Sequence, residues 1–234
     1  MRLHRFFVEE KIVPGSSVAI TDAKLLHQWR NVLRLKAGGE VILFDGSGMD
    51  YRCELTRLEK KEAVCGVLEE MKESARPAQT LVLFASLIKK DSFEWLLEKA
   101  TELGVSEIRP VIADRSEVKN INLERGRDIL KEATEQSGRG SIPLLREATE
   151  LLTAVKEQSG MSLLAFDRDG KPFKKEEWNK VTNIGAFIGP EGGWSARELA
   201  LFGEQHIPVC SLGTSTLRAE TAGVAVTALL LLQS

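Results

Sequence analysis

Cysteine and histidine are scarce in this chain of 234 residues, and neither is clustered. The three cysteines are Cys53, Cys65 and Cys210. The three histidines are His4, His27 and His206. An odd number of separated cysteines without C-x-x-C spacing argues against a disulfide framework and a zinc site, and the dispersed histidines argue against a metal cluster. We therefore expect a protein of a reducing compartment that uses no metal.

Long apolar runs are also missing. The start, MRLHRFFVEEKIV, contains no stretch that suits a signal peptide. The longest late run, residues 222–232, is shorter than the roughly 20 apolar residues that a membrane-spanning helix needs. These features predict a cytoplasmic protein with no membrane partner.

Common catalytic fingerprints are absent as well. The sequence has no Walker phosphate loop, no G-x-G-x-x-G dinucleotide turn and no G-x-S-x-G nucleophile elbow. Nucleotide hydrolysis, hydride transfer and serine-hydrolase chemistry therefore lose support.

Neither sign of charge is in excess over the whole chain, because 32 basic and 34 acidic side chains leave a net charge of -2. A nucleic-acid partner would have to be held by a local patch. Such a patch lies between residues 2 and 36, where seven basic residues accompany three acidic ones. The basic residues are Arg2, Arg5, Lys11, Lys24, Arg30, Arg34 and Lys36. An ordinary solvated face is the alternative explanation.

The first 72 residues have the pattern of a small β domain. Apolar or alternating segments predict strands at residues 6–8, 18–20, 41–44, 51–55 and 63–68. One helix, capped by Thr21 or Asp22, interrupts them, and a small barrel is the fold that these elements favour. The polar stretch 70–79, which contains Pro77, is the best candidate for a linker. We therefore place two domains at residues 1–72 and 73–234.

Strands and helices alternate in the second domain. Strands are predicted at residues 81–86, 107–113, 161–167, 183–189 and 207–213, and helices at residues 91–103, 122–137, 149–158, 195–205 and 219–232. This alternation predicts an α/β domain with a parallel sheet that helices cover on both faces. Ligands of such sheets bind beyond the carboxyl ends of the strands, so the candidate site lies at Gly189 and Gly213.

The closing helix, AETAGVAVTALLLLQ, is apolar almost all the way round. On the surface of a small domain such a helix would expose much hydrophobic area. A partner subunit would cover that area, which favours a homodimer. Burial inside the monomer is the rival explanation.

Two loops stand out at the ends of predicted strands. Residues 188–193, IGPEGG, follow an apolar strand and precede Ser195-Ala196-Arg197-Glu198, a capping box that begins a helix. Glycines let the backbone approach a ligand closely, although a tight turn without a ligand would also favour them. In the second loop Arg218 and Glu220 flank the start of the closing helix, where a cation opposes the helix dipole. This placement suggests function, and an Arg218–Glu220 ion pair is the simpler alternative.

These loops resemble those of the ribosomal RNA small subunit methyltransferase E family, in the SPOUT class of RNA methyltransferases. The loop motifs are GPEGG (189–193) and LG...LRAETA (212–222). The other similar segments are HRFF (4–7), HQWRNVLR (27–34), FDG (44–46), LIKKDSFEWLLEKATELGV (87–105), DRSE (114–117) and EQSGR (135–139). The chain departs from the family where Thr214-Ser215-Thr216 replace Pro-Arg and a hydrophobic residue before Leu-Arg, and where DRS replaces ERS. These departures concern details of cofactor contact.

The resemblance implies an α/β fold with a PUA-like barrel, a SPOUT-type domain with a C-terminal trefoil knot, and a homodimer. It also implies transfer of a methyl group from S-adenosyl-L-methionine to N3 of a uridine in 16S ribosomal RNA of the small subunit. The implied cofactor-binding residues are Ile188, Gly189, Pro190, Glu191, Gly192, Gly193, Leu212, Gly213, Thr216, Leu217, Arg218, Thr221 and Ala222.

The chemistry suggests roles for several side chains. N3 must lose its proton, and Glu191 or Glu220 is our candidate base. Charge on the neighbouring carbonyl oxygens would be stabilised by Arg218, Arg115 or Arg139. Glu220 could instead only fix Arg218. Phosphate contacts are expected from the barrel arginines, namely Arg2, Arg5, Arg30 and Arg34.

Two other functions stay open. A related methyltransferase could act on another RNA or on a ribose 2′-hydroxyl. A non-catalytic ribosome-assembly protein could retain the same fold without binding the methyl donor.

Overall fold

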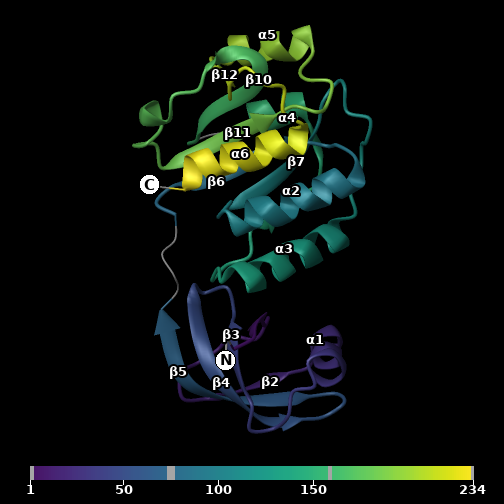
Figure 1. Ribbon diagram of the computed structural model, residues 1–234, viewed down its shortest axis with the longest axis vertical. Helices are drawn as coiled ribbons and strands as arrows, with labels where there is room; N and C mark the ends of the chain where they lie inside the picture. Colours follow the sequence, from purple (N-terminus) through teal and green to yellow (C-terminus); the bar gives the residue numbers. More distant parts are fainter. Residues whose placement is uncertain (1–2, 73–76, 158–159, 233–234) are drawn as a thin grey trace. The chain divides into compact units, whose positions relative to one another are not determined.

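The computed structural model describes residues 3–72, 77–157 and 160–232 and divides into two compact units (Figure 1). The first unit comprises residues 1–75 together with residues 134–142, and the second comprises residues 76–133 and 143–234. Each unit has its own core, and each is described by itself. The expected linker overlaps the change from one unit to the other, although residues 70–72 belong to a strand and residues 73–76 lie outside the described residues.

The first unit is built on a curled five-stranded sheet. Its strands are β1 (Arg5–Phe7), β2 (Ser17–Ile20), β3 (Glu40–Phe44), β4 (Met49–Leu58) and β5 (Ala63–Lys72). They are ordered β1-β3-β4-β5-β2, with β1 parallel to β3 and the other pairs antiparallel. On β4 the side chains of Tyr51, Cys53 and Leu55 alternate with partly exposed ones, as expected for a strand with one face on a core. All five predicted strands are present.

The predicted helix of the first unit is also present, in two parts. Helix α1 (Ala23–His27) is capped by Asp22, whose carboxylate accepts hydrogen bonds from the backbone N–H groups of Lys24 and Leu25. A π-helical turn, η1 (Gln28–Val32), continues it directly. Trp29, which is fully buried, anchors this turn against Phe6 of the sheet.

The second unit contains a seven-stranded sheet in which every described ladder is parallel, which confirms the predicted sheet type. Its strands are β6 (Thr80–Ser86), β7 (Glu107–Ile112), β8 (Leu144–Leu145), β9 (Thr149–Glu150), β10 (Ser162–Pro172), β11 (Asn183–Ile188) and β12 (Val209–Ser211). The order is β12-β10-β11-β6-β7-β8, with β9 also paired to β7. The strand predicted at residues 207–213 is shorter than expected, and β8 and β9, with two residues each, were not predicted.

Helices lie on both faces of this sheet (Figure 1). The helices of the unit are α2 (Lys90–Glu102), α3 (Leu123–Ser137), α4 (Leu151–Lys156), α5 (Ala196–Glu204) and α6 (Ala219–Leu231), with a 3-10 turn η2 (Lys175–Glu177). The last residues of α3, from 134 on, belong to the first unit. On one face, α4 and α5 close a cluster in which Phe187 stacks on Phe84 and contacts Phe202. On the other face α6 packs against β6, β11 and α2. There Gly223 allows close approach, because a Cβ atom would lie 2.6 Å from Leu96 Cδ1.

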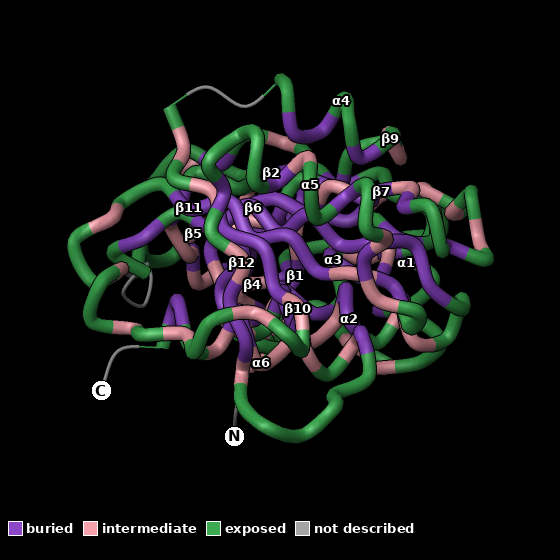
Figure 2. Tube along the Cα trace, turned by 90° about the horizontal axis from the view of Figure 1, so that it is seen from above, coloured by how far each residue is buried: buried purple, intermediate pink, exposed green. Residues whose placement is uncertain are grey.

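Burial follows the strands of both units (Figure 2). The closing helix α6 is partly buried within its own unit, through residues including Gly223, Val226 and Leu230, while Leu229 and Leu232 stay exposed. Burial inside the monomer therefore accounts for part of the apolar sequence of α6. The exposed leucines are left for a partner subunit to cover. The three cysteines are buried and free, and burial raises the pKa of the Cys53 thiol to about 11 and that of Cys65 to about 12.

Candidate active site

One cavity of about 320 Å³ lies at the carboxyl ends of β10, β11 and β12 in the second unit. It is lined by Arg115, Phe166, Asp167, Arg168, Asp169, Ile188, Gly189, Pro190, Glu191, Gly192, Gly193, Trp194, Leu199, Ser211, Leu212, Gly213, Ser215, Thr216, Leu217, Ala219 and Ala222. The two predicted loops thus meet in one cavity. Their strands are not neighbours in the sheet, however, because β10 lies between β11 and β12.

The loop after β11 is held in shape from inside. Gly193 takes a left-handed φ of 67°, and its N–H donates to the carbonyl oxygen of Pro190 at 2.9 Å. Buried Trp194 donates from Nε1 to the carbonyl oxygen of Phe166 at 2.9 Å, which fixes the loop against β10. A Cβ atom at Gly189 would lie 3.2 Å from the Trp194 ring. Glycine therefore lets the loop pack closely against this ring.

The predicted capping box at the start of α5 is confirmed. Ser195 accepts a hydrogen bond from the N–H of Glu198, and the Glu198 carboxylate accepts one from the N–H of Ser195 at 2.7 Å. The helix therefore begins at a fixed point directly after Trp194.

The loop after β12 contains a second glycine in an unusual conformation. Gly213 has φ 137°, in the region that favours glycine, and no atom lies within 4 Å of where its Cβ would be. The hydroxyl of Ser211 donates to the carbonyl oxygen of Gly213 at 3.1 Å. Thr216 and Leu217 then line the cavity before α6 begins. The loop is thus open toward the cavity at Gly213.

A third wall was not predicted from the sequence. The pairing of β10 with β12 is interrupted after Phe166 and resumes at Lys171, so the residues between them bulge out of the ladder. Asp167, Arg168 and Asp169 of this bulge line the cavity. A charged run ending in glycine directly after an apolar strand is the signal that could have located it. Gly170 is required, because a Cβ atom there would lie 2.6 Å from the backbone carbon of Cys210.

Arg115 reaches the cavity from the end of β7. Its Nη1 donates to the carbonyl oxygen of Gly192 at 2.6 Å. Asp114, just before it, accepts a hydrogen bond from the hydroxyl of Ser195 and pairs with Arg197. These two contacts hold the pKa of Asp114 below its usual value, with Ser195 the larger cause. A basic side chain is thereby set against the glycine loop.

The predicted cofactor-binding and catalytic residues of this unit do not all line the cavity. Of the predicted cofactor-binding residues, all line the cavity except Arg218 and Thr221, which are exposed beside it. Glu191 lines the cavity, whereas Glu220 lies in the first turn of α6, partly buried and outside the lining. No ion pair joins Arg218 and Glu220 in the described part of the chain. An ion pair with Glu220 therefore does not explain why Arg218 stands at the start of α6.

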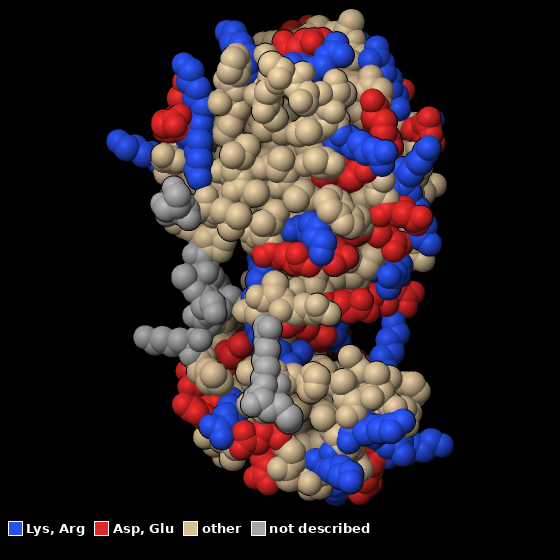
Figure 3. All heavy atoms as spheres, viewed as in Figure 1, with Lys and Arg blue, Asp and Glu red and all other residues tan. Residues whose placement is uncertain are grey.

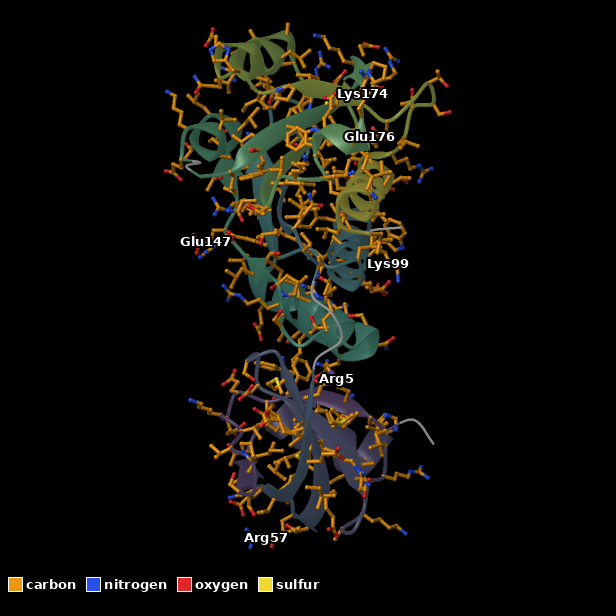
Figure 4. All side chains as sticks on the ribbon, turned by 90° about the vertical axis from the view of Figure 1, so that its left-hand side faces the viewer. Arg5, Arg57, Lys99, Glu147, Lys174 and Glu176 are labelled. Atoms are coloured by element: carbon orange, nitrogen blue, oxygen red, sulfur yellow. The ribbon has the colours of Figure 1, made fainter. Side chains whose placement is uncertain are left out.

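The other predicted residues belong to the first unit. Arg139 is partly buried there, next to the end of α3. Arg30 and Arg34 are exposed, and Arg2 lies outside the described residues. Arg5 differs from expectation, because its guanidinium pairs with Asp50 at 2.6 Å and its side chain is only 8% exposed. Figure 4 labels Arg5 within this unit and Arg57, which projects outward.

Within 3–72, 77–157 and 160–232 there is no group of three or more His, Cys, Asp or Glu side chains that could hold a metal ion. In the same ranges no helix is long and apolar enough to cross a membrane.

Comparison with known proteins gives consistent matches over nearly the whole chain. A model of the RNA methyltransferase domain matches residues 75–231, and one of the RNA methyltransferase PUA domain matches residues 30–68. The chain is similar to the ribosomal RNA small subunit methyltransferase E of Rickettsia conorii, with 28% identity over 96% of this chain and 93% of that protein. The enzyme of the same description from Synechocystis is 31% identical over 94% of this chain and 74% of that protein.

A solved structure gives the same picture. The crystal structure of a ribosomal RNA small subunit methyltransferase E from Neisseria gonorrhoeae, bound to S-adenosyl methionine, matches with a TM-score of 0.90. The identity is 30%, and the match covers 97% of this chain and 96% of that one.

Proposed function

This chain belongs to the RNA methyltransferase family, and on that premise we propose that it transfers the methyl group of S-adenosyl-L-methionine to N3 of a uridine in 16S ribosomal RNA of the small subunit. The observation that carries the proposal is that one cavity is lined by residues 188–193, by Leu212, Gly213 and residues 215–217, and by the bulge of β10. Relatives that cover nearly all of this chain are described as ribosomal RNA small subunit methyltransferases E, and the structure of one of them contains S-adenosyl methionine.

The residues present fit the donor. Gly213 leaves open space where any other residue would carry a side chain. Asp167, Asp169 and Glu191 place carboxylates on the lining, which suits a cationic sulfonium and an amino group. The donor, when bound, supplies a methyl group that is already activated, so the chain has to bind it, orient it and exclude water.

The target base requires separate handling. A paired and stacked uridine hides N3, so the base must be single-stranded or turned out of the helix before it enters the cavity. Its N3 proton has to leave as the methyl group arrives. Glu191, on the lining, is the proposed acceptor of this proton, and Glu220 is the second candidate.

Charge that develops on the carbonyl oxygens of the uracil needs a nearby cation. Arg115 lines the cavity, and its bond to Gly192 uses only part of its donor set. Arg218, exposed at the N-terminus of α6, is the second candidate. For Arg139, in the first unit, the same role stays a proposal that rests on the resemblance alone.

We assign RNA phosphate contacts to Arg30 and Arg34 of the first unit, with Arg2 proposed from the sequence alone. Both described side chains are exposed and lie within the segment that the PUA-domain model matches. Arg5 is left out of this set, because its guanidinium is already paired inside its unit.

We further propose that the protein acts as a homodimer in the cytoplasm, with the knotted topology that the resemblance implies. Figure 3 shows an expanse without charged side chains over α6, where Leu229 and Leu232 are exposed. Exposed Trp95 belongs to α2, which packs beside α6. A second copy would cover this apolar area. Buried, unpaired cysteines suit a reducing compartment.

One experiment tests the central proposal. Small ribosomal subunits that lack the modification are incubated with the protein and labelled S-adenosyl-L-methionine, and the product nucleoside is identified by mass spectrometry. We expect label in N3-methyluridine of 16S ribosomal RNA, and none with Gly213→Val, because a φ of 137° strains any residue other than glycine and the loop that lines the cavity would shift. Label in a ribose 2′-methyl group, or in another RNA, would contradict the proposed substrate. If S-adenosyl-L-methionine did not stabilise the protein against heat, the proposal that it is a methyltransferase would be wrong.

A further inference from the structure

The turn that follows α1 has an uncommon backbone. Gln28–Val32 forms a π-helical turn, closed by a hydrogen bond from the N–H of Leu33 to the carbonyl oxygen of Gln28 at 2.9 Å. Such turns hold one residue more than an α-helical turn, and they occur frequently at functional sites. The turn is therefore a place to look for a function.

The residue that ends this helical segment is strained. Arg34 has φ 53°, and it shares a left-handed backbone with only one other non-glycine residue in the described ranges, His206. Glycine would take this conformation without steric cost. A non-glycine residue kept in this conformation marks the end of the turn as a place to look for a function.

Side chains of the turn divide sharply into anchored and exposed ones. Trp29 is fully buried, and Leu33 packs against the same core. Val32 is 66% exposed, more than any other large hydrophobic residue in the described part of the chain. Asn31, beside it, is exposed and its amide has no hydrogen-bond partner among the described residues. A rigid support thus presents an apolar group and an amide to solvent.

The charges around the turn are all of one sign. Between Asp22 and Glu40 the chain has four basic residues and no acidic one. The four are Lys24, Arg30, Arg34 and Lys36. Among the residues that the structure describes, Arg30, Arg34 and Lys36 have no carboxylate partner. The chain segment that contains Val32 is therefore locally basic, which suits a polyanion.

We infer that the Gln28–Val32 turn reads an unpaired nucleotide of the RNA substrate: Val32 packs on the base, Asn31 hydrogen-bonds its edge, and Arg30 and Arg34 hold the adjoining phosphates. The inference rests on the proposed function, because it takes RNA as the substrate. Proteins recognise single-stranded RNA by stacking unstacked bases on aromatic rings or arginine planes and by bonding the base edges, while phosphate contacts set the position. Here the exposed Val32 supplies an apolar surface in place of a ring. The other exposed large hydrophobic residues of this unit, Val13, Leu68 and Met71, lie outside this basic segment.

The test separates apolar contact from charge. Binding of the full chain to unmodified small subunits is measured across a salt series for wild type, Val32→Thr, Val32→Ser and Arg30→Ala. The matched control is Val13→Ser, an exposed valine of the same unit. Arg30→Ala should reduce the slope of log affinity against log salt by about 1. Val32→Ser should weaken binding about threefold to tenfold at every salt concentration, without changing the slope.

Each outcome decides the matter. Wild-type affinity in both Val32 variants, or an equal loss in Val13→Ser, would overturn the inference. If Val32→Ser weakens binding to subunits but not to protein-free 16S ribosomal RNA, the turn contacts a ribosomal protein, and the inference is again wrong. Binding of S-adenosyl-L-methionine by these variants should equal that of wild type. A failure of wild type to methylate RNA would instead count against the proposed function, so the two failures are distinguishable.

Discussion

The carboxylate of Glu198, only 3% exposed, accepts a hydrogen bond from the backbone N–H of Asp114 at 2.8 Å. Its other oxygen accepts from the N–H of Ser195. One buried side chain therefore joins the end of β7 to the helix that follows the glycine loop. Because Arg115 comes directly after Asp114 and bonds Gly192, this connection also sets the position of Arg115 at the cavity.

Replacing Glu198 by Gln tests this connection. The two backbone N–H groups bond different oxygens of Glu198, and Gln replaces one of these acceptors by an NH2 donor, so one buried N–H loses its partner. We expect the free energy of unfolding to fall by about 1–3 kcal/mol, and binding of S-adenosyl-L-methionine to weaken as the loop loses its fixed position. Urea denaturation and titration calorimetry measure the two effects.

The matched control is Glu204→Gln at the exposed end of the same helix, which should change neither quantity. If Glu198→Gln is destabilised yet binds the donor with wild-type affinity, the connection supports the fold only and does not position the site.

Asp114 should make stability depend on pH in the acid range. Its pKa in the folded protein lies below the ordinary 3.8, first because Ser195 donates a hydrogen bond to it and then because Arg197 pairs with it. A carboxyl group with a depressed folded pKa contributes stability above its unfolded pKa and loses it as pH falls through the folded pKa. The advantage of wild type over Asp114→Asn should be constant near neutral pH and shrink below 3.8. Urea denaturation at several pH values measures it.

Arg197→Ala provides the comparison, because it removes the exposed ion-pair partner and leaves the Ser195 hydroxyl in place. It should cost less stability than Asp114→Asn, since exposed ion pairs contribute little. An advantage that stays the same at every pH would contradict the assignment.

Gly170 should be intolerant of any side chain. A Cβ atom there would lie within 2.9 Å of three backbone atoms of Cys210, so β10 and β12 would have to separate. We expect Gly170→Ala to cost about 1–3 kcal/mol of unfolding free energy, and to impair donor binding because the bulge forms a cavity wall. Gly203→Ala in α5 is the control, since nothing lies within 4 Å of its Cβ position. Alanine there should stabilise the helix by roughly 0.5–1 kcal/mol. Equal stability of the two variants would contradict the prediction.

Local signals in the sequence located the elements well. The Asp22 cap and the Ser195 capping box act over a few residues, so the sequence itself shows where α1 and α5 begin. The glycine loops were predicted because the carboxyl edge of a parallel sheet collects ligand sites wherever its strands lie. The bulge of β10 could not be predicted in the same way, because it depends on the pairing register with β12, which is distant in sequence.

The role of Arg5 shows a second limit of the sequence. Counting charges along the chain placed it in a basic patch, because its partner is 45 positions away. Strand pairing brings the partner near: Phe7 lies opposite Phe44 on β3, and Phe44 lies opposite Asp50 on β4. The ion pair between Arg5 and Asp50 can therefore be predicted only once the order of the strands in the sheet is known.

The last prediction concerns this ion pair of the first unit. The guanidinium of Arg5 bonds both oxygens of Asp50, at 2.8 and 2.6 Å, and lies 3.6 Å from the centre of the Phe44 ring. Arg5→Ala would leave a mostly buried carboxylate unpaired, so we expect a loss of about 2–4 kcal/mol in urea denaturation. The salt dependence of RNA binding should stay that of wild type, in contrast to Arg30→Ala. A lower salt slope with unchanged stability would show instead that Arg5 contacts RNA phosphate.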